Sequence, residues 1–159
     1  MSQNQQVIET LYSSFSRKDY KGMAACYHPD ATFTDEAFNL KSAKEIAAMW
    51  HMLIESGKDM RMEYRDIEAD QQSGKAHWEA YYSFSRTGNK VHNIIDATFE
   101  FKEGKIIRHR DYFNFWRWAG MALGMPGKLL GWTPLIRNKV QKTARENLDK
   151  FIAKHPEYS

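Results

Sequence analysis

A two-residue turn, Glu103-Gly104, constrains the fold of this chain more than any other feature. The runs 91–102 and 105–116 on either side of it are rich in β-branched and aromatic residues, as strands are. A two-residue connection that contains glycine favours a tight antiparallel hairpin. Pairing of Lys102 with Lys105 then sets the register and places Asp96 directly opposite Asp111.

This register predicts a group of ionisable side chains on one face of the hairpin. Opposite side chains in a sheet have Cβ atoms about 4.5–5.5 Å apart, so two ionised aspartates would repel unless one is protonated. Apolar walls would raise their pKa values and create a base or a neutral acid near pH 7. The alternative is a solvent-facing surface on which both acids are hydrated. The predicted face carries Asp96, Asp111 and His109 among Ile94, Phe113 and Phe115.

The run 75–86 alternates apolar and polar residues and predicts a neighbouring strand. Its even positions, which include Trp78 and Tyr82, should face the same side as Asp96. A three-residue loop at 87–89 with one left-handed residue would place Ala80 opposite Asp96.

The other side of the strand at 91–102 is apolar as well, through Val91, Ile95, Ala97, Phe99 and Phe101. A strand that is apolar on both faces is typically covered twice. We therefore expect a homodimer that packs on this sheet face, with the protein's own tail as the alternative cover.

The first 57 residues predict three helices and one short strand. Apolar residues recur at helical spacing over 7–15, and Asp19 can cap a second, short helix. Ser42, with Glu45 three residues later, predicts the start of a third helix that contains Trp50 and ends at Gly57. The short strand spans 31–35, and another strand spans 60–70. The expected fold is α+β, with three helices packed on a curved, mostly antiparallel sheet.

Composition limits the protein class. A chain of 159 residues, 42 % of them hydrophobic, is expected to form one domain with a substantial core. The single cysteine, Cys26, excludes an intramolecular disulfide, and no apolar N-terminal run resembles a signal peptide, so a cytoplasmic protein is expected. The net charge of +3 is concentrated after residue 116, where 8 Lys/Arg accompany 3 Asp/Glu. No motif for nucleic-acid binding accompanies this charge, and we expect no such partner.

The tail, residues 117–159, differs from the preceding 1–116. Glycines and a proline punctuate 117–133, which predicts irregular structure. Thr133 and Pro134 then predict the start of a basic amphipathic helix. The tail is expected either to dock on the same domain or to act as a lid. Contact of its helix with a membrane surface is a weaker expectation.

Two motifs resemble a known superfamily. YHPDATFTD at 27–35 and FKEGKIIRHRDYFN at 101–114 resemble SnoaL-like proteins and Δ5-3-ketosteroid isomerases of the nuclear-transport-factor-2-like superfamily. The resemblance covers about residues 5–116. It implies a cone-shaped fold around an apolar pocket. This scaffold hosts isomerases, cyclases, dehydratases, hydrolases and non-catalytic modules, so it does not by itself name a reaction.

The resemblance to the isomerases implies roles for individual residues. Asp35 matches their general base, and Asp96 matches the protonated aspartic acid that hydrogen-bonds the enolate oxygen. Their third functional residue, a tyrosine on the first helix, falls at Leu11, one position from Tyr12. Tyr82 of the sheet is a possible substitute for it.

The resemblance to SnoaL-type aldol cyclases implies a histidine and an acid/base aspartate at His109 and Asp111. Asp111 also matches an aspartate of limonene-1,2-epoxide hydrolase. The partners that activate water in that hydrolase are replaced here by Trp78 and Ala80, which makes this reaction less favoured.

The resulting hypothesis is a homodimer that binds a small apolar carbonyl compound without cofactor or metal. Asp111 or Asp35 would act as the base, and Asp96 or His109 as the hydrogen-bond donor. The alternatives are a non-catalytic carrier or sensor, or an assembly module. The expected pocket lining is Tyr12, Trp50, Trp78, Tyr82, Ile94, Phe113 and Phe115.

Overall fold

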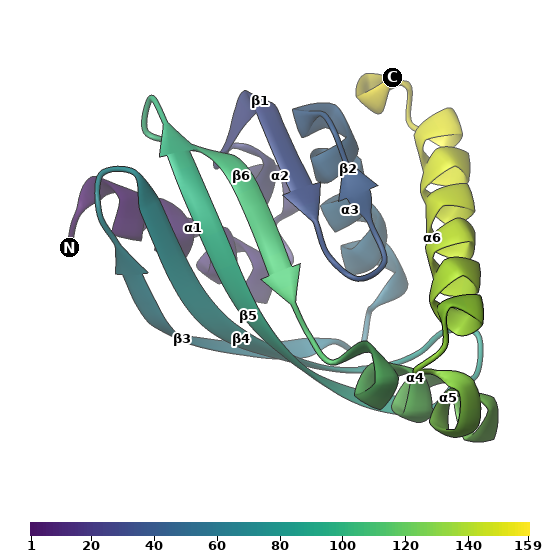
Figure 1. The fold of residues 1–159 in the computed structure, drawn as a ribbon. Helices are drawn as coiled ribbons and strands as arrows, with labels where there is room; N and C mark the ends of the chain where they lie inside the picture. The colour runs from purple at the N-terminus through teal and green to yellow at the C-terminus, as the bar shows by residue number, and fades with distance from the viewer.

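A curved six-stranded sheet forms the centre of the computed structural model, which describes residues 1–159 (Figure 1). The strand order is β2-β1-β6-β5-β4-β3. Strand β1 runs parallel to β6, and every other neighbouring pair is antiparallel. The strands are β1 (Tyr27–Thr34), β2 (Asn39–Leu40), β3 (Arg61–Ala69), β4 (Ser73–Ser83), β5 (Lys90–Lys102) and β6 (Lys105–Tyr112).

Three helices cover one face of this sheet: α1 (Gln3–Ser16), α2 (Tyr20–Ala24) and α3 (Ala43–Ser56) (Figure 1). The predicted caps are present, because Asp19 accepts a hydrogen bond from the Gly22 N–H and Ser42 accepts one from the Glu45 N–H. Helix α3 ends at Gly57 as expected. The buried faces of α1 and α3 meet the sheet in a core of 24 residues. The predicted α+β fold class is confirmed.

The segment predicted to be irregular is instead helical. It forms α4 (Phe115–Leu123) and α5 (Met125–Leu130), followed by α6 (Pro134–Lys154) and a 3₁₀ turn (Pro156–Tyr158). Gly127 lets α4 and α5 approach closely, since a Cβ atom there would lie 1.9 Å from the Ala119 carbonyl oxygen. Gly127 is therefore needed for the packing of two helices and does not mark a turn. No helix combines the length and the apolar character that a membrane crossing requires.

The register of the β5–β6 hairpin differs from the prediction. Lys102 does pair with Lys105, and Glu103 and Gly104 have positive φ angles of 55° and 76°. However, Ile107 is an extra residue in β6, because Glu100 pairs with Arg108 whereas Phe101 pairs with Ile106. A shift by one residue sends side chains to the opposite face.

As a result, Asp111 lies opposite Ala97, and Asp96 lies opposite Tyr112. The predicted opposition of the two aspartates is wrong. The apolar alternate residues of β5, such as Ile95 and Phe99, face the helices and are buried. The expectation that they form a second, outer apolar face is also wrong.

The β4–β5 hairpin has a longer connection than predicted. Its last pair is Ser83 with Lys90, and Gly88 supplies the expected left-handed residue with φ = 75°. The even positions of β4 face the core as expected, but Ala80 pairs with Asn93 and not with Asp96.

Candidate active site

Four buried side chains form one hydrogen-bonded chain inside the cone. The Trp50 Nε1–H of α3 donates to Tyr27 Oη at 3.1 Å, and Tyr27 Oη lies 2.9 Å from His109 Nδ1. His109 Nε2 lies 2.9 Å from Asp111 Oδ1. His109 and Asp111 are 1 % and 2 % exposed, so the chain ends at a carboxyl group shielded from solvent.

The chemistry of these groups sets the direction of the hydrogen bonds. An ionised carboxyl group only accepts, so the proton between His109 and Asp111 belongs to His109 Nε2. In the Nε2–H tautomer, His109 Nδ1 accepts the Tyr27 hydroxyl proton, while Tyr27 Oη accepts from the Trp50 indole. The Asp111 carboxylate therefore orients the imidazole ring and favours a proton on its Nε2.

Asp111 keeps one oxygen free for chemistry. Both of its hydrogen bonds use Oδ1, the second being a 3.4 Å contact from Trp78 Nε1. Oδ2 has no protein partner. A buried carboxylate with one anchored and one free oxygen is suited to accept a proton from a bound ligand.

Asp35 is a second, half-buried acid whose pKa responds to the charge of Asp111. It follows β1, and its Oδ1 accepts the N–H groups of Ala37 and Phe38, both at 2.7 Å. Burial raises the pKa of Asp35 to about 7, opposed by the hydrogen bond from Phe38 and supported by the negative charge of Asp111. Asp35 therefore exchanges its proton near neutral pH.

Tyr12 supplies a hydroxyl group without a protein partner. Its side chain is 1 % exposed and packs on the rings of Tyr64 and Trp78, with centroid distances of 5.6 and 6.0 Å. Its Oη is fully shielded from solvent and has no hydrogen-bond partner. Burial, followed by the charge of Asp111, raises the pKa of Tyr12 well above its ordinary value. The neutral hydroxyl is therefore available as a hydrogen-bond donor.

The structure brings most of the sequence-predicted residues to the interior. Trp50 and Trp78 are buried, and Tyr82 Oη accepts a hydrogen bond from Trp118 Nε1 at 2.8 Å. Phe113 is half-buried, and Phe115 begins α4 in the small cluster that closes one end of the sheet.

Two predicted residues lie outside. The Asp96 side chain is 75 % exposed and lies 2.8 Å from His77 Nδ1 on the outer face of the sheet. Ile94 is 39 % exposed on that same face. Both predictions fail because β5 has a different register from the expected one with each neighbour: Ala80 of β4 pairs with Asn93, and the extra residue Ile107 moves β6 by one position.

Tyr27 and Trp118 are the contributors that the sequence reasoning missed. Tyr27 enters the site because β1 runs parallel to β6, with Phe33 paired to His109. Counting residues outward from a turn predicts the register of a hairpin, but it cannot predict a parallel pair of strands that are distant in sequence. The YHPD motif that begins at Tyr27 was the available signal.

The interior is filled by aromatic side chains. The centroids of Phe15 and Trp50 are 5.0 Å apart, and those of Trp50 and Trp78 are 6.4 Å apart. Two open surface hollows lie elsewhere, one at α4 and α5 and one at the ends of β3–β6, and neither is lined by Asp111.

One group of potential metal ligands exists, at the contact of α3 with the end of α6. His51, Glu55 and His155 each offer one ligand atom within 4.8 Å of the others. His51 is already bonded to Tyr158 Oη at 2.8 Å and to Glu55 at 2.9 Å, so its polar atoms have partners within the protein.

Comparisons with known proteins agree with this architecture. The family model of the SnoaL-like domain matches residues 8–109. A putative polyketide cyclase from Xanthomonas campestris superimposes with a TM-score of 0.63 at 18 % identity, covering 75 % of this chain and 96 % of that protein.

Two further solved structures are similar. A protein of unknown function from Burkholderia pseudomallei, described as nuclear-transport-factor-2-like, has a TM-score of 0.63 at 18 % identity, covering 72 % of this chain and 92 % of its own. An epoxide hydrolase from M. tuberculosis has a TM-score of 0.61 at 15 % identity, covering 80 % and 95 %. At these identities the likeness shows the fold alone. No curated protein matches the sequence.

Proposed function

This chain belongs to the SnoaL-like domain family, and we propose that it is a cofactor-independent isomerase or cyclase that moves a proton next to the carbonyl group of a small apolar ligand. The observation that supports the proposal is the buried Trp50–Tyr27–His109–Asp111 chain, which ends in a free carboxylate oxygen. Such a group, surrounded by aromatic rings, can act as a base on a weakly acidic C–H bond.

Each residue near Asp111 has a defined part in this proposal. Asp111 Oδ2 removes the proton, while His109 holds Oδ1 and keeps the carboxylate oriented. The Tyr12 hydroxyl donates to the oxygen on which negative charge develops. Asp35, whose pKa is about 7, supplies or accepts the proton that completes the transfer.

The test compares Asp111→Asn with Asp96→Asn. Each variant replaces one carboxylate oxygen by an amide nitrogen and removes the negative charge. Asp96→Asn is the control, because Asp96 lies outside the cone. The probes are cyclohex-3-en-1-one, whose conversion to the conjugated ketone changes the ultraviolet absorbance, and a panel of apolar ketones in D₂O. Deuterium uptake beside the carbonyl is measured by mass spectrometry.

We expect Asp111→Asn to lose activity by about 10²–10⁴-fold and Asp96→Asn to keep it. Full activity in Asp111→Asn would rule out the proposed base.

A carrier that binds without turnover is the second candidate. It is favoured by the aromatic interior, because a ligand held among these rings would be shielded from water. A carrier binds the same ketones with equal affinity in wild type and in Asp111→Asn, and incorporates no deuterium. Epoxide hydrolysis is less favoured, since Asp111 is bonded by Trp78 and His109 rather than by an arginine.

A further inference from the structure

Exposed apolar side chains are concentrated at the end of the molecule formed by α4, α5 and the start of α6 (Figure 1). Nine large hydrophobic residues of the chain are exposed, and six of them lie in this one stretch. Their exposed fractions range from 44 % to 68 %. Large contiguous apolar surfaces usually mark an interaction site. The six residues, here called the α5 patch, are Trp116, Met125, Leu129, Leu130, Trp132 and Leu135.

The α5 patch is a folded surface. The Trp116 indole donates to the Lys128 carbonyl at 2.9 Å, and the Trp132 indole donates to the Leu129 carbonyl at 3.0 Å. The close approach of α4 and α5 at Gly127 fixes these helices against each other. The indoles are therefore held at the surface by the backbone of α5 itself.

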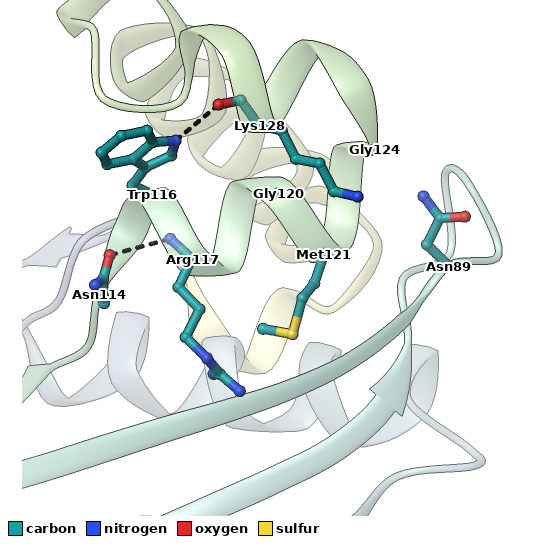
Figure 2. A pocket seen from close by; sticks show the side chains of 8 residues that line it. All are labelled: Asn89, Asn114, Trp116, Arg117, Gly120, Met121, Gly124 and Lys128. Carbon is teal, nitrogen blue, oxygen red and sulfur yellow. Dashed lines mark hydrogen bonds between the residues drawn. The ribbon is translucent and has the colours of Figure 1, made fainter.

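The charge near the α5 patch is mainly positive. Residues 112–145 contain six Lys/Arg and no Asp/Glu, and although Arg137 and Arg145 pair with Glu36 and Glu45, the other four cations have no acidic partner. A hollow of about 650 Å³ beside Trp116 is lined by Arg117 and Lys128 and by no acidic residue (Figure 2). The Arg117 guanidinium donates to the His92 carbonyl of β5, whereas Lys128 lies on α5 next to Leu129. A cation beside an apolar surface is complementary to an anionic phosphate group next to an acyl chain.

We propose that the α5 patch docks on an anionic membrane surface. Tryptophan and leucine side chains would enter the boundary between headgroups and acyl chains, while Lys128 meets lipid phosphates. A second copy of this chain is the less suitable occupant, because self-association through the α5 patch would bring two surfaces of net positive charge together. The chain would lie on the bilayer, in keeping with its lack of a helix that could cross one.

This proposal does not depend on the chemistry at Asp111, although docking would place α4 against the bilayer. Trp118 of that helix contacts Tyr82 of the interior. If the proposed function holds, an apolar ligand dissolved in the membrane would meet the protein at this end.

The test uses the full chain and two kinds of vesicle, phosphatidylcholine alone and an equal mixture of phosphatidylcholine and phosphatidylglycerol. Sedimentation with vesicles and the blue shift of tryptophan fluorescence report binding. We expect the wild-type protein to bind the mixed vesicles, and Trp132→Glu to bind them about tenfold more weakly. Lys128→Glu should weaken binding to the mixed vesicles only. Tyr112→Glu makes the same change in charge at an aromatic residue exposed on the outer sheet face, and should bind as wild type does.

Two outcomes would overturn the proposal. One is failure of the wild-type protein to bind mixed vesicles. The other is a loss of self-association in Trp132→Glu, seen by light scattering, with vesicle binding unchanged, which would assign the α5 patch to a second copy. Circular dichroism of each variant establishes that it is folded, as expected for substitutions at exposed positions.

Discussion

At the scale of single residues, the interior of this protein combines acids that differ in their environments. Asp111 is anchored by a histidine and an indole, whereas Asp35 is held by two backbone N–H groups and destabilised in its charged form by burial. The pKa of Asp35, about 7, lies well above the value near 4 of an unfolded chain. The folded protein therefore holds this proton more tightly than the unfolded chain does.

The first prediction concerns the pH dependence of stability. Between about pH 4 and pH 7 the unfolded chain loses the Asp35 proton before the folded protein does, so the free energy of unfolding falls as pH rises, by up to about 4 kcal/mol. Asp35→Asn keeps the acceptor oxygen but cannot ionise. We expect this variant to lack that slope and to be more stable than wild type at pH 8, as measured by urea unfolding. An unchanged slope would show that Asp35 is not the buried acid responsible.

The second prediction separates two buried tyrosines. Tyr27→Phe leaves the Trp50 indole and His109 Nδ1 without partners, which should cost about 2–4 kcal/mol in the free energy of unfolding. Tyr12→Phe removes a hydroxyl that has no partner, so it should leave stability nearly unchanged while lowering deuterium uptake by bound ketones. Equal destabilisation by the two variants would contradict the proposed hydrogen-bond chain.

Among the helices and strands, the features that depend on a few neighbouring residues could be predicted from the sequence. The caps at Asp19 and Ser42, the Glu103-Gly104 turn and the start of α6 at Pro134 are confirmed. The extra residue at Ile107 was not predictable, because isoleucine is an ordinary strand residue and the bulge depends on how β6 fits between β1 and β5. That residue decides which aspartate lies inside.

Dependence on tertiary packing also explains why the segment that forms α4 and α5 was wrongly predicted to be irregular. Glycine reads as a helix breaker by propensity, but Gly127 is needed where two helix backbones nearly touch. Tertiary packing therefore outweighs the local preference. We predict that Gly127→Ala destabilises the protein by about 1–3 kcal/mol through overpacking against the Ala119 carbonyl.

The control for this third prediction is Gly120→Ala in α4. A Cβ atom there would lie 3.2 Å from the Lys128 side chain, which can move, and alanine favours the helix. Its melting temperature should equal or exceed that of wild type. A melting temperature for Gly127→Ala that matches this control would contradict the close helix contact.

At the scale of the whole molecule, the outer face of the sheet carries an ionic network. Glu79 accepts hydrogen bonds from His77 and His92, which lower its pKa to about 2, and Asp96 contacts His77. Ile94 interrupts this polar surface with an exposed apolar side chain.

A homodimer through the sheet stays a prediction, but the apolar face from which it was predicted lies under the helices, so the interface would have to use the outer face around Ile94. Ile94→Glu would bury a charge in that interface, so we expect it to convert dimer to monomer in light scattering. Leu135→Glu, which adds the same charge to the α5 patch, should keep the wild-type mass. A wild-type protein that is monomeric at high concentration would exclude the interface.

The last helix is attached to the rest of the protein both by ion pairs and by apolar contacts, which include Phe151 and Ile152. Arg137 pairs with Glu36 and Arg145 with Glu45, whereas Leu148 is the single fully buried residue of α6. Pairs of this kind weaken as dissolved ions screen them, while apolar burial in the sheet does not. A concentrated electrolyte would therefore weaken the contacts of α6 with Glu36 and Glu45 while its apolar contacts with the cone persist.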